Sequence, residues 1–240
     1  MSDTLRIAFV AEGPTDKIVI EAVLKSILAD RSFILKQLQP EDSLAFGPLG
    51  AGWSGVYRWC KQSSKRGQGC LSRDALLFAI YDLLILHIDA DVAGMRYQDN
   101  SIDPALSDGK LPCEQPCPPA SSTTHKLRKV VLSWCGEKRP PERVVICMPS
   151  KSTEAWVLAA LYPSDVAMSG EIECLSDPEA RLAQQKKRVR IRKCQSDYWE
   201  QVKSFTDEWP RLTRHKKLGQ ARRFHEDFTR AMNNIEEIGG

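Results

Sequence analysis

The chain has 240 residues, enough for one domain with a full hydrophobic core and an added helical segment. No apolar stretch approaches the ~20 residues that a membrane-spanning helix needs. The first residues, MSDTLRIAF, also lack the basic start and long apolar block of a signal peptide. We therefore expect a cytoplasmic protein with no membrane partner.

The formal net charge of +3 hides an uneven distribution of charge along the chain. Residues 181–230 hold fifteen Lys and Arg residues against six Asp and Glu residues, so the rest of the chain is net acidic. Excess positive charge attracts phosphate backbones through the release of counterions. The charge pattern therefore favours a nucleic acid as the partner of the C-terminal part.

The first predicted element is a strand at residues 7–11, an apolar run typical of a strand that is covered on both faces. Glu12 follows it directly. Pro14 and Thr15 then open a helix whose apolar residues recur at helical spacing. Asp16, in the first turn of this helix, either caps the helix or joins Glu12 in a site.

A second strand is predicted at residues 33–38, followed by the Gly-rich segment GPLGAGWSG. This segment lacks the Gly-Lys-Ser or Gly-Lys-Thr ending of a nucleoside triphosphate loop, so its glycines indicate turns and close backbone approach. A helix at 53–64 leads to a central strand at 83–88. Asp89 and Asp91 follow that strand, either as part of a site or in an ordinary turn.

Residues 99–124 contain many turn formers and little periodicity, which predicts a long loop. The eight cysteines are scattered, and in a reducing compartment we expect free thiols rather than a disulfide framework. Cys113 and Cys117, with His125 downstream, have a spacing that would suit a structural zinc ion, although a fourth ligand is not evident.

A helix is predicted at 125–135 and a strand at 143–148. Ser152 and Glu154 then form a third polar cluster at the start of the next helix. From Pro163 onward, polar linkers separate helices at 178–193, 196–209 and 216–235. The aromatic residues of this region are spaced as core-facing side chains rather than as base-stacking platforms: Trp199, Phe205, Trp209, Phe224 and Phe228.

One run of basic residues in the C-terminal part is predicted to bind nucleic acid. It consists of Lys186, Lys187, Arg188, Arg190, Arg192 and Lys193. The alternative is that the run is a solvated face of a helix.

Strands buried on both faces and separated by helices predict an α/β fold with a mostly parallel sheet. Neighbouring parallel strands end at the same edge of the sheet, so the acidic residues that follow them would crowd into one site. Their mutual repulsion must be relieved by protons or by a cation. Hard oxygen ligands favour Mg²⁺ or Mn²⁺ over Zn²⁺.

Three motifs occur in order within residues 5–160: EGPTD after the first strand, IDADVAG after a later strand, and S-x-E at a helix start. In these motifs the chain resembles the Toprim domain, a metal-binding domain shared by topoisomerases, bacterial primases and OLD-type nucleases. The resemblance is strongest to small bacterial Toprim proteins related to the OLD nucleases. It implies a Toprim-like, Rossmann-like domain at residues 1–162 and a helical basic extension at 163–240.

The OLD-type pattern implies a site with two Mg²⁺ or Mn²⁺ ions. Six residues of this chain match its ligand positions: Glu12, Asp16, Asp89 and Asp91 at one ion, and Ser152 and Glu154 at the second. Two such ions activate water on one side of a phosphodiester and stabilise the leaving oxygen on the other. The implied activity is endonucleolytic hydrolysis of DNA or RNA.

The catalytic residues implied by the resemblance are Glu12, Asp89, Asp91 and Glu154. OLD nucleases also use a downstream lysine, for which Lys151 is one candidate and the basic C-terminal part offers others. The resemblance further implies an ATPase partner protein and a role in bacterial anti-phage defence, and it leaves room for an oligomer.

Other readings of the motifs stay open. An Asp-x-Asp pair also occurs in haloacid dehalogenase-type phosphatases and in sugar-nucleotide transferases, although in the phosphatases it follows the first strand. A different class is a nucleic-acid-binding or scaffold subunit that holds a metal without turnover.

Overall fold

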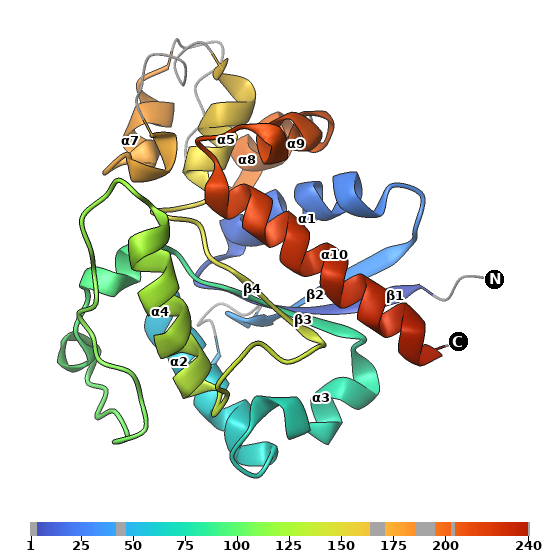
Figure 1. The fold of residues 1–240 in the computed structure, drawn as a ribbon, viewed down its shortest axis with the longest axis vertical. Helices are drawn as coiled ribbons and strands as arrows, with labels where there is room; N and C mark the ends of the chain where they lie inside the picture. Colours follow the sequence, from blue (N-terminus) through green and yellow to red (C-terminus); the bar gives the residue numbers. More distant parts are fainter. Residues whose placement is uncertain (1–3, 42–46, 164–170, 186–194, 203–204, 240) are drawn as a thin grey trace.

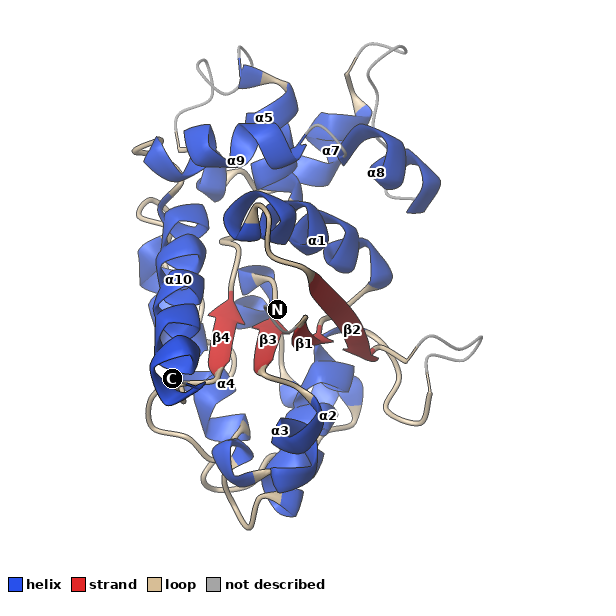
Figure 2. Ribbon diagram, turned by 90° about the vertical axis from the view of Figure 1, so that its right-hand side faces the viewer, coloured by secondary structure: helices blue, strands red, loops and turns tan. Residues whose placement is uncertain are grey.

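The computed structural model of the chain describes residues 4–41, 47–163, 171–185, 195–202 and 205–239. Four parallel strands form one sheet in the order β2-β1-β3-β4. The strands are β1 (Leu5–Val10), β2 (Phe33–Gln39), β3 (Leu83–His87) and β4 (Val144–Cys147). Figure 2 shows them side by side with helices above and below. The predicted α/β fold with a parallel sheet is therefore confirmed.

Helices account for most of the remaining chain (Figure 1). The α-helices are α1 (Pro14–Leu28), α2 (Gly52–Arg66), α3 (Ala75–Ile80), α4 (Ser121–Trp134), α5 (Glu154–Leu161), α7 (Pro178–Ala183), α8 (Gln195–Val202), α9 (Phe205–Arg214) and α10 (Gly219–Gly239). Short 3₁₀ helices lie between them: η1 (Leu71–Arg73), η2 (Ala90–Gly94), η3 (Tyr97–Asn100) and η4 (Ile172–Cys174). None of the helices among the described residues combines the length and the apolar composition of a membrane-spanning segment.

The inner strands β1 and β3 and the edge strand β4 are mostly apolar and buried because both faces of the sheet are covered, whereas the other edge strand, β2, is partly exposed. Along β1, Ile7 and Phe9 pack into a cluster with residues of α1, α5, α9 and α10. Ala8 and Val10 point the other way, into a cluster with residues of α2, α4 and η2. The sheet is thus the middle layer of a three-layer structure.

The connections reverse direction between β1 and β3, which are neighbours in the sheet. After β1 the chain crosses through α1 to β2 on one side, and after β3 it crosses through α4 to β4 on the other. The two helices pack on opposite faces, because α1 belongs to one apolar cluster and α4 to the other. In open α/β sheets, ligands bind at the carboxyl ends of the strands where the order reverses.

The Gly-rich segment has the predicted role in backbone geometry. Gly52 has a φ of +70°, in the left-handed region that favours glycine. A Cβ atom on Gly55 would lie 2.8 Å from the carbonyl oxygen of Gly50. The Gly52 amide donates to the carbonyl of Glu12 (2.8 Å), so this segment lies against the end of β1.

The C-terminal helices complete one face of the core. Phe205, Trp209, Phe224 and Phe228 are all buried in the cluster that also contains Trp156 of α5. The prediction that these residues face the core is confirmed, whereas the side chain of Trp199 lies outside the described residues. The proposed domain boundary at residue 162 stays a prediction.

The expectation of free thiols is wrong for one pair of cysteines. Cys117 and Cys174 form a disulfide across a sequence separation of 57 residues. Cys117 is therefore not available with Cys113 for the zinc site considered from the sequence. A spacing argument compares cysteines that are close in sequence, and the partner here comes from a distant segment.

A buried carboxylate fixes the start of α10. Glu173 is 2% exposed and accepts hydrogen bonds from the backbone amides of Gln220 (2.9 Å) and Ala221 (3.2 Å) and from the Trp156 indole (3.2 Å). Burial raises the pKa of Glu173 to about 7, although these donors favour the ionised form. Glu173 therefore joins η4, α5 and α10 at an energetic cost when it is ionised.

This cost predicts how stability depends on pH. Between pH 4.5 and about 7 the folded protein keeps a proton on Glu173 that the unfolded chain has released. The free energy of unfolding should therefore fall by about 3 kcal/mol as the pH rises through this window. Glu173→Gln keeps an acceptor oxygen without the charge, so it should flatten the decline and exceed the wild type in stability at pH 8.

Urea unfolding at pH 5 and pH 8 measures this effect. Glu179→Gln, at an exposed position of α7, is the matched control and should decline with pH as the wild type does. An undiminished decline in Glu173→Gln would show that Glu173 is not its source.

Candidate active site at the carboxyl ends of the strands

The first two predicted acidic clusters meet where the strand order reverses. Glu12 follows β1 and Asp89 follows β3, and Val10 pairs with Leu86 in the parallel register of these strands. The Glu12 Oε1 atom accepts a hydrogen bond from the Asp89 backbone amide at 2.8 Å. The turns after two strands that are distant in sequence are thus joined through the Glu12 side chain.

Asp16 caps α1 and also faces the site. Its Oδ2 atom accepts a hydrogen bond from the Gly13 amide (3.0 Å), which is the capping role considered as the alternative from the sequence. The same atom lies 3.7 Å from His87 Nδ1, and Asp16 is 4% exposed. The capping role and the position in the acidic cluster are therefore compatible.

Asp89 lies at the centre of the converging charges. Burial is the main reason why its pKa is raised well above the ordinary value, and the charges of four carboxylates add to the effect. These belong to Asp16, Glu12, Glu154 and Asp91, in decreasing order of effect. Acidic residues from three separate segments of the chain therefore act on one another at this edge of the sheet.

Glu154 and Asp91 occupy different environments within this cluster. Glu154 is the first residue of α5 and is only 1% exposed, because α5 is buried along most of its length. Asp91 lies in η2 and is exposed to solvent. The cluster thus extends from the protein interior to the surface.

His87 is a neighbour of the acids that sequence reasoning missed. It is fully buried at the end of β3, with Nδ1 3.7 Å from Asp16 Oδ2 and Nε2 3.7 Å from Asp89 Oδ1. The imidazole therefore lies between the two carboxylates. A single polar residue at the end of the otherwise apolar run LLILHI was the available signal.

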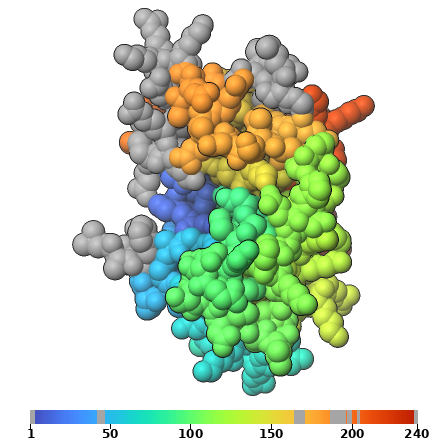
Figure 3. All heavy atoms as spheres, turned by 90° about the vertical axis from the view of Figure 1, so that its left-hand side faces the viewer, coloured from blue at the N-terminus to red at the C-terminus, as the bar shows by residue number. Residues whose placement is uncertain are grey.

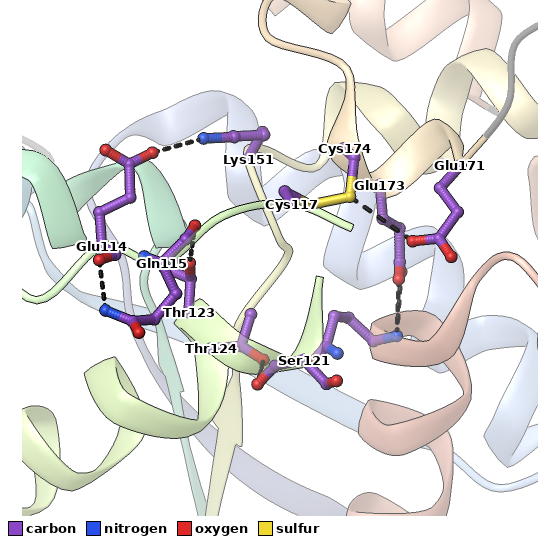
Figure 4. Close-up of a disulfide and its surroundings, with 11 residues drawn as sticks. Glu114, Gln115, Cys117, Ser121, Thr123, Thr124, Lys151, Glu171, Glu173 and Cys174 are labelled. Atoms are coloured by element: carbon purple, nitrogen blue, oxygen red, sulfur yellow. Dashed lines mark hydrogen bonds and ion pairs between the residues drawn. A yellow bond between two sulfur atoms is a disulfide. The ribbon is translucent and has the colours of Figure 1, made fainter. Parts of the chain in front are cut away.

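Of the third predicted motif, Glu154 belongs to the acidic cluster. The residue just before the motif, Lys151, has a different partner. Lys151 Nζ forms an ion pair with Glu114 Oε1 at 2.9 Å, so its side chain extends toward the loop that contains Cys113 and Cys117 (Figure 4). Ser152 is half-buried in the turn before α5, where its carbonyl accepts from the Ala155 amide (3.2 Å).

The donor chemistry of the cluster fits a hard divalent cation. Carboxylate oxygens are the preferred ligands of Mg²⁺ and Mn²⁺. The buried Asp89 Oδ1 atom has no hydrogen-bond partner, since His87 Nε2 at 3.7 Å is too distant. Within the described ranges, however, no three His, Cys, Asp or Glu side chains stand at the spacing of a ligand set. Cation binding would therefore require rotations of the acidic side chains.

The predicted nucleic-acid-binding run, Lys186 to Lys193, lies outside the described residues.

Comparison with known proteins gives no further assignment. A scan against protein-family models and searches of curated proteins and of solved structures find no match to this chain.

Repulsion within the cluster predicts that removing one buried charge stabilises the metal-free protein. Asp89→Asn should raise the melting temperature by about 2–4 °C for each kcal/mol of repulsion relieved. The gain should be larger at pH 8 than at pH 5, because the raised pKa of Asp89 makes its ionised form costly.

Thermal melts in EDTA test this expectation, and Asp91→Asn is the matched control at an exposed position. Added MnCl₂ should then stabilise the wild type more than Asp89→Asn, because a ligand stabilises only the state that binds it. A lower melting temperature for Asp89→Asn at both pH values would contradict the expected repulsion.

Proposed function

We propose that this chain is a Toprim-type nuclease that hydrolyses phosphodiester bonds of DNA or RNA with Mg²⁺ or Mn²⁺. The observation that carries the proposal is the convergence of Glu12, Asp16, Asp89 and Glu154 at the edge where the strand order reverses. This edge is the usual ligand-binding edge of an open α/β sheet. A concentration of carboxylates there is costly to stability, and its expected benefit is the binding of divalent cations.

The residues of the site have distinct parts in this proposal. Divalent ions would supply the charge that activates water and stabilises the leaving oxygen. Glu12, Asp16, Asp89, Asp91 and Glu154 would hold them, with Ser152 as an additional ligand. Two carboxylates are already oriented by backbone amides, Glu12 by that of Asp89 and Asp16 by that of Gly13. Such orientation lowers the cost of assembling the site.

Lys151 is the proposed partner of the substrate phosphate, because it immediately precedes the turn that leads into Glu154. In the present structure its ammonium group pairs with Glu114. An ATPase partner protein and a role in bacterial anti-phage defence remain proposals that rest on the resemblance to OLD-type proteins.

Cleavage of nucleic acid tests the proposal. Purified protein with Mg²⁺ or Mn²⁺ should cut plasmid DNA, single-stranded DNA or structured RNA, and EDTA should stop the reaction. Glu12→Gln and Asp89→Asn should each lower the rate by about 100-fold or more, because each removes a proposed ligand. Asp99→Asn, an exposed acid of η3, is the matched control and should cut normally.

Two results would point elsewhere. Cleavage that persists in both site variants would place the active site at other residues. Tight binding without cleavage by the wild type would favour the alternative function, a nucleic-acid-binding or scaffold subunit.

Binding tests the proposed role of the basic run. Reversing two charges, Lys187→Glu together with Arg190→Glu, should weaken binding and reduce the slope of log Kd against log salt by about two. Fluorescence anisotropy at several salt concentrations measures both quantities. Lys36→Glu with Lys138→Glu changes the net charge equally at exposed positions and is the control. An unchanged slope in the first variant would assign the run to a solvated helix face.

A further inference from the structure

A groove lies beside the acidic cluster and contains Lys151. It has a volume of about 480 Å³, and its lining includes Glu114, Cys117, Lys151, Cys174 and Ser176. One wall is the groove loop, defined here as residues 113–117, and the other is the segment that follows η4. Figure 3 shows the face of the molecule on which the green region that includes the groove loop meets the orange region that includes the segment after η4.

The wall formed by the groove loop borders the acidic cluster. The backbone amides of Cys113 (2.7 Å) and Glu114 (3.1 Å) both donate to the carbonyl of Ala93 in η2, the 3₁₀ helix that carries Asp91. At its other end, the loop is linked to η4 by the Cys117–Cys174 disulfide.

The opposite wall is firmly attached to the core. Cys174 directly follows Glu173, whose buried carboxylate accepts hydrogen bonds from the Gln220 amide and the Trp156 indole. The disulfide therefore ties the groove loop to a rigid part of the molecule (Figure 4).

The ion pair between Lys151 and Glu114 depends on this arrangement. Glu114 has a half-exposed side chain, and ion pairs of that kind are weak by themselves. The pair at 2.9 Å is therefore stable only while the backbone holds Glu114 next to Lys151. The Glu114 backbone is held by its own amide bond to Ala93 and by the contact of Gln115 with Thr123, and the disulfide, three residues further on, adds a constraint on the end of the loop nearest η4.

We propose that the Cys117–Cys174 disulfide is a redox-modification site that controls Lys151. In the bonded form, the groove loop keeps Lys151 paired with Glu114. Reduction by a dithiol releases the loop from η4 and frees the ammonium group for a phosphate oxygen in the groove. The last step rests on the proposed nuclease function, whereas the release of Lys151 does not.

The sulfur atoms are accessible to such a reductant, since both half-buried cysteines line the groove. A thiolate of the dithiol attacks one sulfur, the S–S bond breaks, and the displaced cysteine takes up a proton. The second thiol of the reductant then resolves the mixed disulfide. Two electrons and two protons pass to Cys117 and Cys174, and the dithiol becomes a disulfide. The Cys174 thiol would then face Glu171 Oε2, which lies 3.6 Å from its sulfur.

Acylation of lysine side chains tests the release of Lys151 directly. The full-length protein is treated with an N-hydroxysuccinimide acetate, oxidised or after dithiothreitol, and modified peptides are quantified by mass spectrometry. Reduction should raise the acylation rate of Lys151 by about threefold or more, since a broken ion pair exposes the amine. Lys138, an exposed lysine outside the groove, is the internal control and should not respond.

Three variants separate the disulfide from other effects of the reductant. Cys117→Ser with Cys174→Ser should acylate as fast as the reduced wild type and should not respond to dithiothreitol. Cys113→Ser, a free cysteine of the same loop, should retain the response. Glu114→Gln should show fast acylation of Lys151 with the disulfide intact. Equal rates in oxidised and reduced wild type would overturn the proposal and leave the disulfide as a purely structural cross-link.

Cleavage assays on the same samples distinguish this proposal from the proposed function. Reduced wild type should cut faster than oxidised wild type in the presence of Mg²⁺. If Lys151 responds to reduction but neither form cuts, the nuclease function fails and the redox control of Lys151 is supported. If both forms cut equally and Lys151 does not respond, the nuclease function is supported and the redox control fails.

Discussion

Repulsion among buried carboxylates is the constraint on which the proposed site depends. Asp89 is buried within reach of four other acidic side chains, and the sheet, not the acids, supplies the stability that holds them together. Apolar clusters on both faces of the sheet offset the cost of this one edge. A site of this kind is an area of local instability that the rest of the fold supports.

The sheet also determines which acids meet. Glu12 and Asp89 are far apart in sequence, yet β1 and β3 are neighbours and end at the same edge. The reversal of strand order between them directs α1 and α4 to opposite faces. Topology thus places the two turns together at the edge where open α/β sheets bind their ligands.

Much of this arrangement could be predicted from the sequence, because it follows from strong local patterns. The buried strands read as continuous apolar runs, and the acids that follow β1 and β3 could be located by chain order alone. The position of His87 between Asp16 and Asp89 could not, since it depends on side-chain directions within the folded site. The Cys117–Cys174 disulfide could not be predicted from cysteine spacing either. The two cysteines are 57 residues apart in sequence, and neither lies in a segment with a periodic apolar pattern.

The start of α4 shows a similar limit. Periodicity of apolar residues places this helix at 125–135, whereas it begins at Ser121. Its first turn, Ser-Ser-Thr-Thr, contains no apolar residue that would mark it. Thr123 instead exchanges hydrogen bonds with the backbone of Gln115, a tertiary contact that sequence periodicity cannot indicate.

The burial of Trp156 has a consequence for how the molecule can be divided. This side chain belongs to α5, two residues after Glu154, and it is covered by Trp209 and Phe224 from the last two helices. A fragment that stopped at residue 162 would lose the aromatic cover of this indole, although α1 and α5 would still pack on that face of the sheet. The C-terminal helices therefore share the core that supports the acidic edge, and a fragment ending at residue 162 is expected to be less stable than the full chain.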